Sequence, residues 1–205
     1  MTVIVASNSN LKRSIQSQER LEAIFHTVDT IKSDLNKCGM RLQEARQLCA
    51  IAPFASAADS FTCTYGIADE PLLENVVKGQ QNLMVATNEF FKKDKAVLIY
   101  DLISKAWEMN EIKSSASSNP VLKNPLQNDY PVNSMVVALK KVEYKFYPAL
   151  RLLKRKADKG NFQPLLAEVS DFYVTYFPDA NSVLYRIEVN KKEQIRGYIF
   201  LLNLV

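Results

Sequence analysis

A seven-residue apolar rhythm in residues 18–50 constrains the fold more than any other feature of this chain. The stretch contains no proline and one glycine. Its apolar residues form two rows: Leu21, Val28, Leu35, Leu42 and Cys49 on the first, and Ile24, Ile31, Cys38 and Ala45 on the second. A spacing of three and four places both rows on one stripe of a helix, with most charged residues outside it. The sequence therefore predicts one long N-terminal helix, which we assign to residues 1–50.

After this helix the apolar period changes to two, which is typical of strands. Pro53 and the small residues that follow it predict a loop. Strands are expected at residues 61–65, 83–87, 96–103, 106–112, 142–146, 172–176, 183–189 and 198–204. The last of these is almost continuously apolar, which predicts a strand buried on both faces. The expected fold class is therefore α+β, with the long helix packed as one unit on an antiparallel β domain in residues 51–205.

Residues that carry chemistry are sparse. The single histidine, His26, lies inside the predicted helix and is expected on its surface, so a histidine-rich metal site is not expected. Glycine-rich phosphate loops, nucleophile elbows and zinc-protease motifs do not occur in the sequence. The net charge of +4 is small for 205 residues, so nothing demands a nucleic-acid partner. We expect no catalytic residues, no metal, no cofactor and no small-molecule substrate. The lone Trp107 is expected to pack in the core.

The three cysteines leave two interpretations open. Cys38 and Cys49 are eleven residues apart, which at about 1.5 Å per residue separates them by roughly 16 Å along a helix, beyond disulfide reach. Cys49 and Cys63 could pair across the loop that contains Pro53. The other interpretation is three reduced, buried cysteines.

Several local patterns match in combination. At the end of the predicted helix, Ile31, Asp34, Leu35 and Gly39 fit the pattern I-x-x-D-[LI]-R-x-A-G. In the last third, an ordered series fits V-x-Y, L-x-R and Q-x-L-[LV]-x-x-V-x-x-F-x-[VL]-x-Y: Val142, Tyr144, Leu153, Arg155, Gln163, Leu165, Leu166, Val169, Phe172, Val174 and Tyr176. Together these patterns resemble the minor pilins of type IV pili, of the PilW type, and pseudopilin J of type II secretion.

This resemblance implies a pilin-like fold and a non-enzymatic role in assembly. It implies that the first part of the helix projects and meets other minor pilins or pseudopilins in a tip or priming complex, through Leu11, Ile15, Leu21 and Phe25. It implies that the second part packs on the chain's own sheet, through Val28, Ile31, Leu35, Leu42 and Ala45. Residues 1–10 would continue a membrane-spanning half-helix that precedes them. The protein would then be held in the inner membrane with a periplasmic domain, before joining the pilus or pseudopilus tip.

A different class of protein shares the same helix pattern. In a cytosolic coiled-coil adaptor, the heptad stripe would pair with another helix, and the β region would be a separate binding module. Sedimentation would distinguish the two, since the adaptor is expected to be a tight dimer that dissociates when residues 1–35 are removed.

Overall fold

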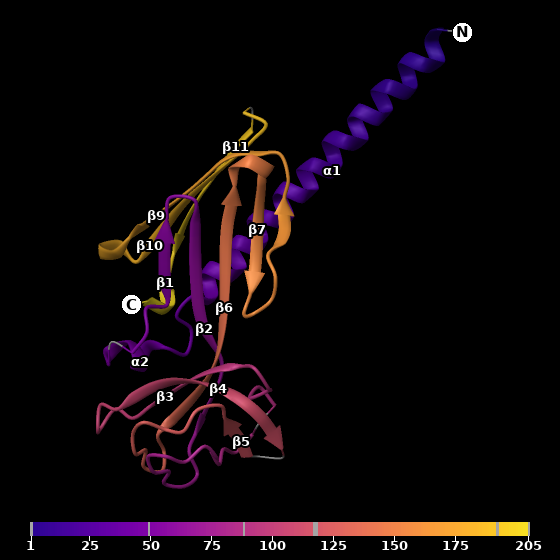
Figure 1. Ribbon diagram of the computed structural model, residues 1–205. Coiled ribbons are helices and arrows are strands. Elements are labelled where there is room, and N and C mark those ends of the chain that lie inside the picture. The colour runs from indigo at the N-terminus through magenta and orange to yellow at the C-terminus, as the bar shows by residue number, and fades with distance from the viewer. Residues whose placement is uncertain (1, 49, 88, 117–118, 192, 205) are drawn as a thin grey trace.

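A long helix, α1 (Thr2–Lys37), projects from one end of a β-rich body (Figure 1). The computed structural model describes residues 2–48, 50–87, 89–116, 119–191 and 193–204, and it describes no side chains for residues 2–13 and 116. The helix has 36 residues, so at about 1.5 Å per residue it is roughly 54 Å long. Its C-terminal half lies along the body, and its N-terminal half extends beyond it.

Gly39 ends this helix. Its φ of 77° lies in the left-handed region, which glycine adopts without steric cost. The N–H of Gly39 donates to the carbonyl of Thr64 at 3.0 Å instead of continuing the helix. After this turn comes a short helix, α2 (Gln43–Gln47). The prediction of one continuous helix to residue 50 is therefore wrong beyond Lys37.

Within the described residues, the strands form two antiparallel sheets. The larger sheet has the order β1-β2-β6-β3-β4-β5, with β7 paired to β6 and β8 paired to β7. Its strands are β1 (Phe54–Ala57), β2 (Ser60–Pro71), β3 (Ala96–Tyr100), β4 (Trp107–Ala116), β5 (Asn119–Leu122), β6 (Met135–Tyr147), β7 (Leu152–Ala157) and β8 (Gln163–Leu166). The smaller sheet has the order β11-β10-β9 and contains β9 (Val169–Phe177), β10 (Ser182–Val189) and β11 (Glu193–Phe200). Short 3-10 helices follow β6, β9 and β11: η1 (Pro148–Leu150), η2 (Pro178–Ala180) and η3 (Leu202–Leu204).

The two longest strands, β2 and β6, run through both ends of the body (Figure 1). They pair from Ser60 opposite Lys145 to Pro71 opposite Met135, with a register shift between Gly66 and Ala68. A bulge of this kind increases the local twist, so the two halves of a strand face different neighbours. One half packs against α1 and the smaller sheet, and the other half carries β3, β4 and β5.

Three groups of buried apolar residues make the core. The first lies among α1, the larger sheet and the smaller sheet, and contains Ile24, Ile31 and Leu35 with the stacked rings of Phe61 and Tyr144. The second fills the lower end of the body, between β3, β6 and the connecting loops. The third packs Leu42 and Ala45, around α2, against β3 and β6. Apolar residues on both sides of the Gly39 turn are thus buried, but in separate cores.

The expected α+β, pilin-like fold class is wrong, because the chain is mainly β. Of the described residues, 83 lie in strands and 41 in the two α-helices. The helix ends earlier than the heptad pattern suggested, and two sheets facing each other supply most of the first core. The helix therefore packs against a structure that is built mainly from the two sheets.

Other local predictions also need correction. Residues 198–204 are not a buried strand: β11 is the edge of its sheet, Tyr198 and Phe200 are exposed, and η3 follows. Residues 83–87 form no strand but contain an isolated bridge between Leu72 and Val85. Trp107, expected in the core, is also exposed. At the chain end and in loops, a period-two pattern marks side chains that alternate between buried and exposed. The backbone there need not be paired with a strand on both sides.

The cysteine at position 49 lies outside the described residues. Cys38 and Cys63 are free and buried. The possible Cys49–Cys63 disulfide therefore involves a residue outside the described ones and stays a prediction. In the structure, the thiol of Cys63 donates to the carbonyl of Asp34 at 3.3 Å.

Candidate interaction site on the projecting helix

The surface of α1 changes character where the helix leaves the body. Ile24 is 5% exposed, whereas its neighbour Phe25 is 65% exposed. Successive residues lie about 100° apart around a helix, so these two side chains face different directions. Leu21 and Ile15 are also exposed, at 45% and 47%. We call Ile15, Leu21 and Phe25 the outer face of α1.

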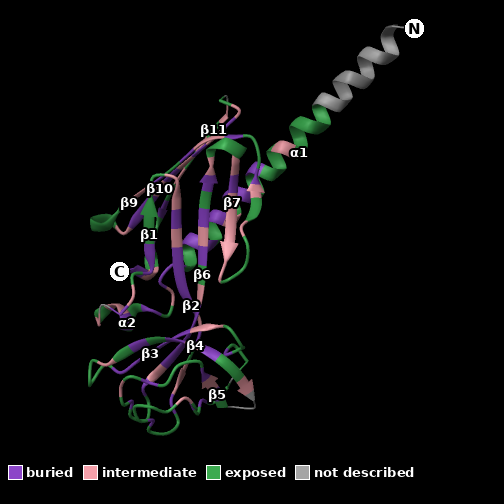
Figure 2. Ribbon diagram, viewed as in Figure 1, coloured by how far each residue is buried: buried purple, intermediate pink, exposed green. Residues whose placement is uncertain are grey.

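The outer face continues the buried stripe at one residue and departs from it at another. Leu21 lies in the same heptad row as the buried Val28 and is exposed where the helix leaves the body, whereas Phe25 lies outside that row. Leu21 and Phe25 are four residues apart and therefore neighbours on the helix surface, about 40° apart around its axis. Figure 2 shows the exposed part of α1 in green beyond the body and the buried part in purple behind the sheet. A neighbouring helix could thus contact Leu21 and Phe25 without displacing the body. Leu11, the fourth residue expected at this surface, lies in the stretch whose side chains are not described.

The residues expected to hold the helix against the sheet are all buried. Val28, Ile31 and Leu35 lie on the part of α1 that faces the body. Leu42 and Ala45 are buried as well, but they lie after the Gly39 turn and pack in the third core. The sequence pattern joined these two groups into one stripe, although the chain turns at Gly39 between them and the two groups pack in separate cores.

A charged anchor fixes the lower half of α1 to the larger sheet. The side chain of Asp34 is almost fully buried, at 6% exposed. Arg155 on β7 donates to it from Nε at 2.7 Å and from a terminal nitrogen at 3.2 Å, and the hydroxyl of Tyr144 on β6 donates at 2.5 Å. Bidentate, charge-assisted bonds of this kind are among the strongest in proteins. They hold one turn of α1 at a defined position and rotation on the sheet.

Electrostatics at the anchor follow from these contacts. The hydrogen bond to Asp34 raises the pKa of the Arg155 guanidinium, which stays charged. Burial, followed by the negative charge of Asp34, raises the pKa of Tyr144 well above its usual range. The phenol therefore remains a hydrogen-bond donor, and the buried carboxylate keeps both of its partners.

Periodicity could not reveal this anchor. Asp34 is 110 residues from Tyr144 and 121 from Arg155. All three residues occupy places in the patterns that resemble minor pilins, and this was the only signal in the sequence that connected them. A helix carboxylate, a strand tyrosine and a strand arginine are otherwise ordinary surface residues in a sequence reading.

Two further hydrogen bonds lock the same half of α1. The hydroxyl of Thr27, which is fully buried, shares its proton between the carbonyl of Ala23 in the same helix, at 2.8 Å, and the carbonyl of Leu165 on β8, at 3.2 Å. At the C-terminal end of α1, the side-chain amide of Asn203 donates to the carbonyl of Asn36 at 2.8 Å. The helix is therefore attached at its middle and at its end, and the described side chains before Ile24 reach the body through the ion pairs of Arg20 with Glu193 and Glu168.

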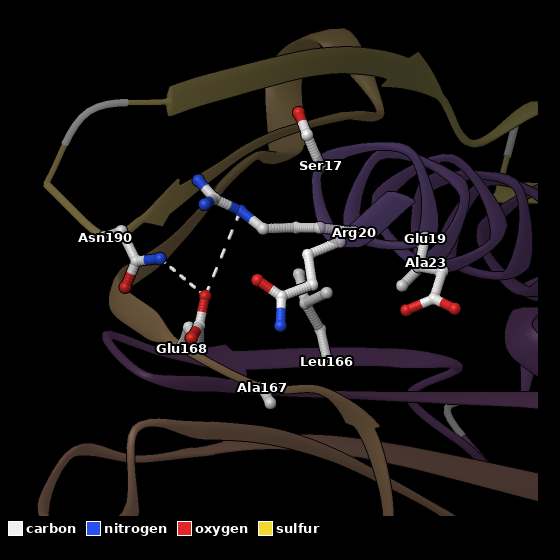
Figure 3. A pocket seen from close by; sticks show the side chains of 9 residues that line it. Ser17, Glu19, Arg20, Ala23, Leu166, Ala167, Glu168 and Asn190 are labelled. Atoms are coloured by element: carbon white, nitrogen blue, oxygen red, sulfur yellow. Dashed lines mark hydrogen bonds and ion pairs between the residues drawn. The ribbon is translucent and has the colours of Figure 1, made fainter. Parts of the chain in front are cut away.

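An open groove of about 650 Å³ marks the point where α1 leaves the body (Figure 3). Its walls are α1 around Arg20 and the loop between β8 and β9, including Glu168. Arg20 forms ion pairs with Glu193 at 2.7 Å and with Glu168 at 3.9 Å, and the amide of Asn190 donates to Glu168. All three charged side chains are 30–55% exposed, so water screens the pairs and their net contribution is small. The groove is therefore an open, charged surface feature and not a closed binding cavity.

Within the described residues, no group of three or more His, Cys, Asp or Glu side chains is placed to bind a metal ion. Among the helices that are described, none is both long enough and apolar enough to cross a membrane. His26, expected on the helix surface, is exposed on α1.

Comparisons with known proteins show only weak and partial similarity to this chain. No protein-family model matches the sequence, and no curated protein matches it. Among solved structures, the chain is similar to the Gp54 tailspike of Acinetobacter baumannii bacteriophage AP22, solved in complex with A. baumannii capsular saccharide, with 18% identity and a TM-score of 0.33. The similarity covers 38% of this chain and 15% of the tailspike chain. The chain thus spans a small part of the tailspike, and its site is interpreted from its own residues.

Proposed function

We propose that this chain is a non-enzymatic assembly subunit of the minor pilin or pseudopilin class. It joins other minor pilins or pseudopilins in a tip or priming complex through the outer face of α1. We also propose that the protein is held in the inner membrane, with its body in the periplasm, before it enters a type IV pilus or a type II secretion pseudopilus. The role requires a helix that is fixed at one half and free at the other, and it does not depend on the class of fold behind the helix.

The observation that carries the proposal is the contrast between Ile24 and Phe25. One side chain is buried against the body, and the next, a large aromatic ring, is 65% exposed. A partner that covered this ring would gain about 1.5–3 kcal/mol from its burial. Leu21 lies beside it, so the two form an apolar patch suited to a helix-in-groove or helix–helix contact.

The anchor at Asp34 supports the same role. A helix that must present its outer face to neighbours loses affinity if it moves freely, because the partner must then order it on binding. The bonds of Arg155 and Tyr144 to Asp34 hold α1 in place in the isolated chain. The subunit is thus pre-organised for assembly.

The test is co-purification of a tagged chain with the other minor pilins or pseudopilins of its source organism. Phe25→Glu and Leu21→Glu are expected to remove the partners, while the unfolding midpoint in urea stays unchanged. The matched control is Ile103→Glu, which places the same charge on a side chain that is 92% exposed in the turn between β3 and β4. That variant should keep its partners. Unchanged recovery of partners by Phe25→Glu would overturn the proposal.

The coiled-coil adaptor is less consistent with the buried side of α1. Ile24, Ile31 and Leu35, which would form the seam of a coiled coil, are packed against the chain's own sheets. Only the segment before residue 24, about six turns of α1, remains for pairing. A monomer in sedimentation at all accessible concentrations agrees with the assembly role, whereas a tight dimer that depends on residues 1–35 favours the adaptor.

A further inference from the structure

Cys38 and Cys63 lie together in a fully enclosed position at the end of α1. Cys38 is the first residue after α1, and Cys63 lies on β2. Neither side chain is exposed. The next residues of both segments are joined by the hydrogen bond from the N–H of Gly39 to the carbonyl of Thr64 at 3.0 Å. The backbone itself therefore holds the two cysteines side by side.

Each thiol donates to a carbonyl in a segment that lies beside the other cysteine. The thiol of Cys63 donates to the carbonyl of Asp34 at 3.3 Å, in the helical turn that ends at Cys38. The thiol of Cys38 donates to the carbonyl of Pro53 at 3.2 Å. Pro53 directly precedes β1, whose first residue, Phe54, is paired with Cys63. The N–H of Thr64, the residue after Cys63, donates to the same carbonyl of Pro53 at 2.7 Å, so the Cys38 thiol and the Cys63 segment meet at one acceptor.

We propose that Cys38 and Cys63 form an intramolecular disulfide when the chain folds in an oxidising compartment. The inference is independent of partner binding by the outer face. A thiolate of one cysteine attacks a disulfide oxidant, such as oxidised glutathione, and releases one of its thiols. The second cysteine then attacks the mixed disulfide and releases the other thiol. The two cysteines together lose two protons and two electrons, and the oxidant becomes two thiols.

The reaction belongs to folding and not to the finished structure. Burial raises the pKa of the Cys63 thiol, so almost none of the reactive thiolate is present once β2 is covered. An oxidant also has no access to a side chain that is fully enclosed. The disulfide therefore forms before the end of α1 closes over β2, and folded, reduced protein should oxidise much more slowly than refolding protein.

The bond would join the end of the helix to the sheet covalently. It closes the loop from residue 38 to residue 63, which includes α2 and β1. The anchor at Asp34 is one turn away, so the disulfide and the ion pair hold the same end of α1. A sideways force on the projecting half of α1 would then act on β2 through the covalent bond, and the end of the helix would stay attached to the body.

Refolding of the full chain with reduced and oxidised glutathione tests the proposal. Free thiols are then alkylated, the protein is digested without reductant, and the peptides are analysed by mass spectrometry. The expected product joins the peptides of Cys38 and Cys63, with the loss of two hydrogen atoms, and carries alkyl groups on Cys49. Alkylated Cys38 and Cys63 after refolding with oxidant, or a bond from Cys49 to either of them, would overturn the proposal.

Variants give a second readout. Cys49→Ser should keep the joined peptides, and its urea midpoint should fall on addition of a reductant, as in the unchanged chain. Cys38→Ser should show no such fall, because no disulfide remains to be reduced. An equal response to reductant in Cys38→Ser contradicts the assignment. The peptide analysis of the unchanged chain decides the matter even if Cys38→Ser folds poorly.

Discussion

Arg155 and Asp34 form a bidentate ion pair across 121 residues of sequence, with nitrogen–oxygen distances of 2.7 and 3.2 Å. One comes from β7 and the other from the second half of α1. Because the carboxylate is nearly enclosed and also accepts from Tyr144, this pair fixes the orientation of the helix on the sheet. The exposed outer face depends on that orientation.

Replacement of the buried carboxylate tests the anchor. Asp34→Asn keeps the shape of the side chain but leaves the Arg155 guanidinium without its counter-charge, and breaking a buried pair in this way typically costs about 3 kcal/mol. We expect a loss of that size in the free energy of unfolding, measured in urea by circular dichroism. Asp29→Asn, at an exposed position of α1, should change it by less than about 0.5 kcal/mol. Equal effects of the two changes would show that the pair is not an anchor.

Truncation of two neighbouring residues on α1 should change the free energy of unfolding by very different amounts. Ile24→Ala removes a buried side chain from the first core and should lower the free energy of unfolding by about 2–5 kcal/mol. Phe25→Ala removes an exposed ring and should change it by no more than about 0.5 kcal/mol. Thermal and urea unfolding measure both. A large loss of stability in Phe25→Ala would mean that this ring packs against the body.

The turn after α1 should accept only glycine. Gly39 has a φ of 77°, and a Cβ there would meet the side chain of Leu204 and lie 2.8 Å from the carbonyl oxygen of Asn203. Gly39→Ala therefore combines left-handed strain, about 1–2 kcal/mol, with a clash against η3. Gly79→Ala is the matched control, because Gly79 has a φ of 93° and nothing within 4 Å of an added Cβ. We expect Gly39→Ala to lower the urea midpoint clearly further than Gly79→Ala, and equal midpoints would exclude the clash.

Alkaline pH should weaken the fold through its buried tyrosines. Burial raises the pKa of Tyr65 from an ordinary value near 10 to about 12. The folded state thus holds this proton more tightly than the unfolded state, so the stabilising effect is complete below pH 10 and is lost as the pH rises through about 12. The free energy of unfolding should fall with pH in this range, and less steeply in Tyr65→Phe.

Tyr173→Phe is the control for this pH dependence, because Tyr173 is exposed on β9. It should leave the slope of unfolding free energy against pH unchanged, as followed in urea titrations at several pH values. Identical slopes in Tyr65→Phe and the unchanged chain would show that Tyr65 ionises equally in both states.

Much of the strand content could be predicted from the sequence, because alternation is a local property. The patterns around Phe61, Val97, Tyr144 and Tyr185 all lie in strands, since each apolar face there is covered by a core. Residues 83–87 alternate in the same way, but no neighbouring strand pairs with them along their length. Alternation reports which side chains are buried, and it does not report whether a backbone has a partner.

The sequence by itself determined that a long amphipathic helix precedes a β-rich chain, because a heptad stripe and period-two strands are encoded locally. Only the tertiary structure decided where that helix ends, since Leu42 and Ala45 continue the apolar rhythm past the turn at Gly39. It also decided where along α1 the stripe stops being covered, because Leu21 and Val28 share one heptad row, yet only Val28 lies against the body. The pairing of Asp34 with Arg155 and the meeting of Cys38 with Cys63 likewise depend on contacts between distant segments, which no periodicity records.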